Sequence, residues 1–244
     1  MPPPDAESEA AAIDRAAPFD EGTQIDRTEP SILDGALMYE ADAPSGEAAG
    51  PAADAGYLLF DDFENGEAEE WQVVIWPDAG AHDTDWSVIV GDTGRVYSED
   101  VLDETQWRIA YASSDAASDQ IVEARMRVGD FYDATPSYVA ALFARYDASS
   151  DSGYFLALRG DGSVIIRKRM QGKNASWAAG VDAGIVSGTW YTVRLEVVGS
   201  TVRAFLDGEL VYTVLDSDPL ARGTVALGTY GATLEVNQVF LAVP

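Results

Sequence analysis

The sequence is poor in several of the residues on which common protein chemistries depend. Its 244 residues include no cysteine, one histidine and only two lysines, Lys168 and Lys173. The absence of cysteine excludes a disulfide framework, a thiolate metal site and a cysteine-linked lipid anchor. No stretch approaches the roughly 18 consecutive apolar residues that a membrane-spanning helix needs, so we expect no membrane span.

Catalytic arrangements are also missing. The only histidine, His82, lies in the loop sequence DAGAHDTD, where we expect it to be solvated, with metal binding beside Asp83 or Asp85 as the alternative. A glycosidase needs two carboxyl groups held about 5–5.5 Å apart, and no predicted strand carries the alternating acids that would supply them. A polysaccharide lyase would need a tyrosine–histidine pair and cation-rich walls. We therefore predict that the chain is not an enzyme.

Positive charge is scarce, and negative charge is abundant. Asp and Glu number 42 against 15 Lys and Arg, which gives a formal net charge of −27. Such a surface repels nucleic acid and anionic lipid, so neither is an expected partner. An acidic, lysine-poor surface is typical of proteins secreted into salty surroundings, where screening weakens self-repulsion. Solubility alone is the alternative explanation.

The N-terminal segment differs from the rest of the chain. Residues 1–55 are rich in Ala, Pro, Gly, Asp and Glu, which predicts an acidic tail or linker with limited order. The patch at residues 31–39, SILDGALMY, is apolar enough to dock on the domain or add a strand, and transient local structure is the alternative. The first residues lack the features of a signal peptide. We expect a secreted or cell-surface protein whose leader has been removed, and a cytosolic protein is the alternative.

Residues 56–244 show the pattern of an all-β domain. In the segment at 188–216, apolar and polar residues alternate, and Gly199-Ser200 and Asp207-Gly208 supply the turns of two tight hairpins. No segment of ten or more residues has helical periodicity. Short strands separated by turn residues predict two facing antiparallel sheets. The predicted strands are 57–61, 71–75, 86–90, 95–97, 107–112, 120–128, 138–146, 153–159, 163–170, 176–181, 190–198, 201–207, 209–215, 224–229 and 234–243.

Several motifs within this domain resemble those of one fold family. They are LFDDFENG at 59–66 followed by Trp71, LFARYD at 142–147, GYFLALR at 153–159 and GTVALGTY at 223–230. Together with the 188–216 segment they resemble concanavalin A-like and laminin-G-like jelly rolls. Within that fold they are similar to bacterial carbohydrate-binding modules of the levan-binding type and the pectate-lyase-appended type. The resemblance implies a jelly-roll β-sandwich over residues 56–244, which binds a glycan and often holds a structural calcium ion.

The resemblance also implies where calcium would bind. In related modules the metal lies where an acidic cluster at the domain's opening meets a carboxylate on the last strand. The matching positions here are Asp61, Asp62, Glu64 and Asn237, which offer the oxygen ligands that calcium prefers. Asn237 stands where the family usually has an aspartate, so the site would lack one charge. The alternative is that these acids only solvate a strand edge.

A basic and aromatic cluster is the predicted ligand site. Arg145, Tyr154, Lys168 and Trp177 lie on consecutive predicted strands or the loop beside them, and Arg145 and Tyr154 fall on positions matched by the resemblance. Aromatic faces stack on sugar C–H surfaces, and arginine supplies forked donors. The alternatives are a solvated sheet face, or an Arg145 buried at the sheet margin as a structural charge.

Two functions follow from these observations. The first is a non-catalytic extracellular carbohydrate-binding module that recognises a glycan on one sheet face. The second is a structural or assembly protein of the cell surface or of an extracellular polymer. In that case the jelly roll is a building block, and the N-terminal tail mediates self-association, because a sandwich exposes edge strands that accept an added strand.

Overall fold

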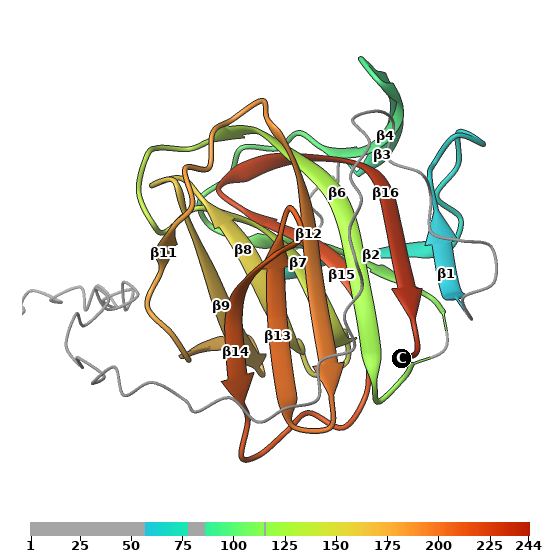
Figure 1. Ribbon diagram of the computed structural model, residues 1–244. Coiled ribbons are helices and arrows are strands. Elements are labelled where there is room, and N and C mark those ends of the chain that lie inside the picture. The colour runs from blue at the N-terminus through green and yellow to red at the C-terminus, as the bar shows by residue number, and fades with distance from the viewer. Residues whose placement is uncertain (1–56, 78–85, 115) are drawn as a thin grey trace, which may run out of the picture. The chain divides into compact units, whose positions relative to one another are not determined.

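The computed structural model describes residues 57–77, 86–114 and 116–244 (Figure 1). Every regular element in these ranges is a β-strand, and none of the described residues forms a helix of the length and apolarity that crossing a membrane requires. The predicted tail at residues 1–55, its apolar patch at 31–39 and His82 lie outside the described residues.

The strands form two sheets in which every pairing is antiparallel. The first sheet has the order β14 (Glu209–Leu215), β13 (Thr201–Leu206), β12 (Trp190–Val198), β6 (Gln120–Phe131), β16 (Ala232–Ala242), β4 (Gly94–Glu99) and β3 (Ser87–Gly91), with β1 (Tyr57–Asp61) also paired to β16. The second sheet has the order β10 (Lys173–Ser176), β9 (Ser163–Met170), β8 (Ser152–Arg159), β7 (Val139–Asp147), β15 (Thr224–Tyr230), β5 (Trp107–Ala112) and β2 (Trp71–Trp76), with β11 (Val181–Asp182) also paired to β9.

The two sheets lie face to face, as Figure 1 shows, and buried apolar side chains fill the space between them. Leu142, Leu156 and Ile166 of the second sheet belong to the same buried cluster as Val193 and Leu195 of the first. Side chains alternate between the faces of a strand, so these apolar positions come from every second residue. The arrangement confirms the predicted fold, a two-sheet antiparallel β-sandwich of the jelly-roll type.

The hairpins predicted around β13 are present. Gly199 (φ +55°) turns β12 into β13, and Asp207 (φ +49°) with Gly208 (φ +84°) turns β13 into β14. The expected strand at 176–181 is wrong in its extent. The structure has instead two short strands, β10 and β11, and the chain leaves the edge of β9 between them so that Trp177 packs against Tyr154.

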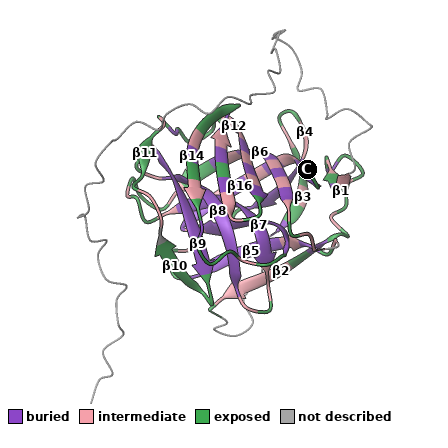
Figure 2. Cartoon of the chain, turned by 60° about the horizontal axis from the view of Figure 1, so that its bottom comes forward, coloured by how far each residue is buried: buried purple, intermediate pink, exposed green. Residues whose placement is uncertain are grey.

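The two sheets differ in burial. Strand β12 of the first sheet alternates between buried and partly exposed residues, whereas every residue of β8 in the second sheet is buried. Figure 2 shows the same contrast, with β7, β8 and β9 in continuous purple. A strand that is buried throughout has apolar or bonded side chains on both faces. The second sheet therefore has an outward face, directed away from the sandwich interior, with a packed layer of its own.

Candidate functional site

The outward face of the second sheet is defined by strand register. Phe143 of β7 pairs with Phe155 of β8, and Phe155 pairs with Arg167 of β9, so the three side chains cross the sheet in a row. Phe143 and Phe155 belong to a second apolar cluster that is separate from the sandwich core. Their sequence neighbours Leu142 and Leu156 point the other way, into the core.

A continuous series of aromatic contacts, here called the aromatic track, runs over this face. It begins at Tyr132, which is 49% exposed and lies in the connection between β6 and β7. Ring centroids along the track are separated by 5.3 Å from Tyr132 to Tyr138, 6.3 Å from Tyr138 to Tyr230, 5.9 Å from Tyr230 to Trp107, 5.6 Å from Trp107 to Phe155, 4.9 Å from Phe155 to Phe143, 5.3 Å from Phe143 to Tyr146 and 6.0 Å from Tyr146 to Tyr111.

Trp107 occupies the middle of the track because the strand beside it carries a glycine. A Cβ atom on Gly228 would lie 3.0 Å from the Phe143 ring and 3.3 Å from the side chain of Ile109, which is crowded, and in ordinary contact with the Trp107 ring at 3.5 Å. The guanidinium of Arg169 lies 5.1 Å from the Trp107 ring centroid on this face. Trp107 is only 8% exposed, so its indole forms the floor of the face.

The contact between Trp107 and Arg169 indicates that the face is concave. Trp107 is on β5 and Arg169 on β9, with β15, β7 and β8 between them. Four strand spacings in a flat sheet would separate the two strand axes by roughly 19 Å. The two side chains meet at 5.1 Å because the sheet curves and both lean over its middle. A concave, mainly apolar face with a few fixed polar groups is typical of ligand sites.

Arg169 is fixed by a buried carboxylate. Its Nε and Nη2 donate to the two oxygens of Asp151 at 2.8 and 2.6 Å, and the hydroxyl of Tyr146 donates to Asp151 at 3.2 Å. Burial raises the pKa of Tyr146, and the negative charge of Asp151 raises it further, so Tyr146 remains a protonated donor. This end of the track is therefore rigid and electrically balanced.

Two more arginines border the track. The Nε of Arg159 donates to the carbonyl oxygen of Pro136 at 2.8 Å, and its Nη1 donates to Ser163 at 3.2 Å. Burial lowers the pKa of Arg159. Burial lowers the pKa of Arg167 as well, and the positive charge of Arg159 lowers it further. Two like charges therefore influence each other at this edge of the face.

A polar pair lies at the Tyr111 end of the track. The Tyr111 hydroxyl of β5 donates to the Oε1 of Gln72, on the neighbouring edge strand β2, at 2.7 Å. Tyr111 is half-buried, so one part of its ring remains accessible. The face therefore combines aromatic surface with hydroxyl, amide and guanidinium groups.

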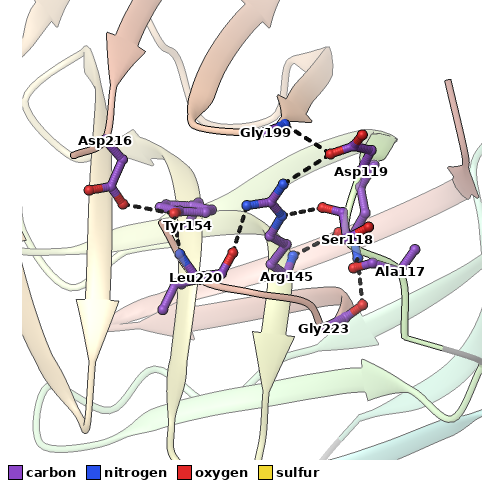
Figure 3. Close-up of polar contacts among 10 residues, drawn as sticks. Ala117, Ser118, Asp119, Arg145, Tyr154, Gly199, Asp216, Leu220 and Gly223 are labelled. Atoms are coloured by element: carbon purple, nitrogen blue, oxygen red, sulfur yellow. Dashed lines mark hydrogen bonds and ion pairs between the residues drawn. The ribbon is translucent and has the colours of Figure 1, made fainter. Parts of the chain in front are cut away.

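The residues predicted from sequence lie on the interior side of the second sheet, and Figure 3 shows two of them, Arg145 and Tyr154, beside each other. Arg145 has a positive φ of 50° at a bulge in β7, which turns its side chain away from the outward face on which Phe143 lies. Its guanidinium donates to the carbonyl oxygen of Ser118, to that of Leu220 at 2.6 Å, and to Asp119 at 3.3 Å. Each branch of the guanidinium thus has a partner within the protein.

Tyr154 and Lys168 share one carboxylate inside the sandwich. The Tyr154 hydroxyl donates to Asp216 at 2.8 Å and accepts from the backbone N–H of Leu220 at 2.7 Å. The Lys168 ammonium lies 2.9 Å from Asp216 and also donates to the carbonyl oxygen of Asp218. Burial alone would raise the pKa of Asp216, but the hydrogen bonds from Lys168, the backbone of Asp218 and Tyr154 lower it overall. These contacts fix the connection between β14 and β15.

Trp177 completes this interior group. Its ring lies 5.1 Å from that of Tyr154, and it is half-buried against the sandwich core. The four predicted residues thus lie on the interior side, because Tyr154 and Lys168 occupy inward positions of their strands. We had expected these residues to face a ligand. The four predicted residues do not include those of the outward face. The alternation of side chains along a strand could have indicated them. Arg167 and Arg169 stand on either side of Lys168 in the sequence, so their side chains project from the opposite face of β9.

The predicted calcium ligands are engaged in local hydrogen bonds. Asp61 accepts from the backbone N–H of Phe63 at 2.8 Å and from the indole N–H of Trp71 at 2.9 Å. Asp62 and Glu64 accept from backbone N–H groups at 3.1 and 3.0 Å. The Oδ1 of Asn237 is buried without a hydrogen-bond partner. Among the described residues, no group of three His, Cys, Asp or Glu side chains is placed to hold a metal ion, and calcium stays a prediction.

Comparisons with known proteins show the fold. No family model and no curated relative match the sequence. The carbohydrate binding module CBM66 from Bacillus subtilis is similar in structure, with a TM-score of 0.56 and 20% identity over 71% of this chain and 95% of that one. A Bacillus licheniformis beta-glucanase has a TM-score of 0.56 and 12% identity over 78% and 100% of the two chains.

A third solved structure, a Bacillus subtilis protein of unknown function with a galectin-like fold, has a TM-score of 0.54 and 12% identity over 77% of this chain and 96% of that one. At these identities the likeness concerns the fold alone, and it includes both binding proteins and enzymes. The chain therefore has the jelly-roll fold to which its sequence motifs pointed.

Proposed function

We propose that the chain is a non-catalytic, extracellular carbohydrate-binding module whose ligand lies on the outward face of the second sheet. The observation that carries this proposal is the aromatic track, with the guanidinium of Arg169 fixed over the indole of Trp107. Sugars present apolar C–H faces and hydroxyl groups, which match aromatic rings and forked donors respectively. The carbohydrate binding module among the fold relatives supports this proposal.

The bonding of Asp151 supports a non-catalytic role. Asp151 lies at one end of the track and accepts hydrogen bonds from Arg169 and Tyr146 through both carboxylate oxygens. Both oxygens of Asp151 are therefore engaged by side chains of the protein itself, and neither is available to exchange a proton with a substrate. A glycosidase would need a second carboxyl group about 5–5.5 Å away and free to exchange protons.

A panel of immobilised polysaccharides tests the proposal. The full chain is expected to bind at least one glycan, and substitution of track residues is expected to weaken that binding while the β-rich circular dichroism spectrum is unchanged. The same polysaccharides incubated with the chain are expected to show no new reducing ends and no absorbance from unsaturated sugars. Failure to bind any glycan would overturn the proposal. Release of reducing ends or of unsaturated sugars would show that the chain is an enzyme and overturn the non-catalytic part of the proposal.

The second candidate is an assembly protein, and one observation favours it. Strand β14 is an edge of the first sheet and carries two exposed leucines, Leu210 and Leu215, which are 54% and 75% exposed. An edge with exposed apolar residues accepts a strand from another chain. Light scattering on the full chain, on a chain without residues 1–55 and on a Leu215→Lys variant distinguishes the candidates. Oligomers that depend on the tail or on Leu215 would favour assembly.

A further inference from the structure

The aromatic track ends in three tyrosines, Tyr230, Tyr138 and Tyr132, of which the last is exposed to solvent. The rings of Tyr230 and Tyr138 are stacked, with centroids 6.3 Å apart and an interplanar angle of 21°, and the Tyr132 ring follows at 5.3 Å. Tyr132 is 49% exposed, whereas Trp107 at the middle of the track is 8% exposed. The track is therefore most accessible to a ligand at these three residues, here called the tyrosine end.

The backbone holds the tyrosine end in place. A Cβ atom on Gly231, which has a φ of +59°, would lie 2.0 Å from the Tyr138 ring, so this ring rests directly on the main chain. The N–H of Tyr132 donates to the carbonyl oxygen of Gly231 at 2.8 Å, and the N–H of Gly231 donates to that of Asp103 at 2.8 Å. The exposed ring is therefore anchored next to the segment that precedes β5, and little ordering is needed when a ligand binds.

The charge around these rings is negative. The Tyr138 hydroxyl donates to the Oε2 of Glu104 at 2.6 Å. This hydrogen bond raises the pKa of Tyr138, and burial and the charges of Glu104 and Asp133 raise it further. Burial raises the pKa of Tyr230, and the charges of Glu104 and Asp103 add to the effect. The tyrosine end therefore lies in the field of three carboxylates.

The three carboxylates differ in how they are neutralised. Arg108 donates to Asp103 at 2.9 Å. Arg159, which also reaches this part of the protein, donates to a backbone carbonyl of the connection between β6 and β7. Glu104 and Asp133 are exposed, and no ion pair among the described residues includes either of them. Two negative charges thus remain available beside the exposed ring of the track.

Building on the proposed function, we infer that the ligand is an amino glycan, with a protonated sugar amine bound between the ring of Tyr132 and the carboxylates of Glu104 and Asp133. An aromatic ring attracts a cation that lies within about 6 Å of its centroid, because the face of the ring is electron-rich. A carboxylate on the same side adds a charge-assisted hydrogen bond. The apolar faces of the adjoining sugars contact the remaining rings of the track.

The net charge of −27 attracts any polycation, so binding at the tyrosine end has to be separated from this general attraction. At physiological ionic strength, charges farther apart than about 8 Å are largely screened. A preference that persists at physiological salt and depends on one particular acid therefore reports a local contact. Both conditions are built into the experiment.

Calorimetry on the full chain tests the inference with oligomers of glucosamine and of N-acetylglucosamine of equal length. Acetylation keeps the sugar backbone and removes the charge. The measurement is made at physiological salt and about pH 5.5, where amines are protonated and ordinary carboxylates are ionised. We expect the glucosamine oligomer to bind at least about fivefold more tightly than the acetylated one. Glu104→Gln is expected to remove most of this preference, because it deletes the charge and keeps an oxygen that accepts from the Tyr138 hydroxyl.

Glu209→Gln is the matched control, because it removes the same charge from an exposed acid of β14 in the first sheet. Thermal unfolding of each variant checks that the fold is kept. Equal affinity for the two oligomers, tighter binding of the acetylated one, or equal effects of Glu104→Gln and Glu209→Gln would overturn the amino-glycan assignment and leave the proposed function intact. The same holds if neither oligomer binds while another polysaccharide of the panel does. Failure of every glycan to bind would overturn both.

Discussion

Strands β7, β8 and β9 carry polar side chains on both of their faces, but the hydrogen-bond partners of the cations differ between the interior side and the outward side. On the interior side, Lys168 and Tyr154 both bond to Asp216. On the outward side, Arg159 donates to the neutral acceptors Pro136 and Ser163, and its Nη1 lies 4.0 Å from the Oδ2 of Asp161. Lys168 lies between Arg167 and Arg169 in the sequence, so adjacent residues of β9 belong to the interior side and to the outward side.

The difference shows what each side does for the protein. The Lys168–Asp216 pair joins β9 of the second sheet to the end of β14 in the first, and so holds the sandwich together. A buried pair of this kind becomes costly when one member is removed, because the other charge is left without compensation. The outward side instead packs arginine side chains among aromatic rings and neutral acceptors, and it is the side on which we propose that a ligand binds.

Asp216→Ala should have the largest effect. The substitution leaves the Lys168 ammonium buried without its carboxylate, and such a loss typically costs about 3–5 kcal/mol of unfolding free energy. Urea unfolding measures the loss. Asp218→Ala is the control, because the exposed Asp218 contacts Lys168 through its backbone carbonyl alone. Equal midpoints for the two variants would show that the interior pair is not structural.

Tyr154→Phe should destabilise the protein less and leave glycan binding unchanged. The hydroxyl donates to Asp216 and accepts from Leu220, so its loss leaves buried groups unpaired at a cost of about 1–3 kcal/mol. Urea unfolding and the polysaccharide panel measure the two quantities separately. A Tyr154→Phe variant that keeps its stability but no longer binds the glycan would show that the interior group, and not the outward face, binds the ligand.

Tyr132→Ala should weaken glycan binding and leave the stability of the protein almost unchanged. Tyr132 is exposed at the start of the track and contacts Tyr138, so its removal costs little stability but removes aromatic surface from the face. We expect affinity for the glycan to fall about tenfold, which corresponds to about 1.4 kcal/mol. Phe60→Ala, on an exposed aromatic residue of β1 in the first sheet, is the matched control and should bind like the wild type.

The fold could be predicted from the sequence because local rules determine it. Alternation in the segment at 188–216 identified β12, β13 and β14, and Gly199 and Gly208 have the positive φ angles that the predicted turns require. The outlines of β8 and β9 were also correct. The extent of the strand at 176–181 was wrong because Trp177 leaves the sheet edge and packs against Tyr154 of β8, a contact that the local sequence pattern does not record.

The outward face could not be predicted in the same way. The two sides of β8 and β9 carry the same residue types, and sequence alone does not show which side faces the other sheet. The bulge at Arg145 reverses the alternation in β7, so Tyr146 falls on the outward face beside Phe143. The contact of Trp107 with Arg169 depends on sheet curvature over four strand spacings, which no local pattern records.

The smallest expected effect is the pH dependence of the stabilisation that Asp216 contributes to the free energy of unfolding. Its pKa in the folded protein lies below the ordinary value of 3.8 because Lys168, the backbone of Asp218 and Tyr154 donate to it despite its burial. A depressed pKa of the folded state means that the stabilisation is complete above the unfolded value and is lost as the pH falls through the folded one. Asp216→Asn cannot ionise, so the gap in unfolding free energy between wild type and variant should be constant above about pH 5 and narrow below about pH 4. The remaining acidic groups titrate in both proteins and cancel in the difference. A gap that stays constant from pH 6 to pH 3 would show that Asp216 gains no stability from its charge, and the contrast between the interior and outward sides would then rest on packing alone.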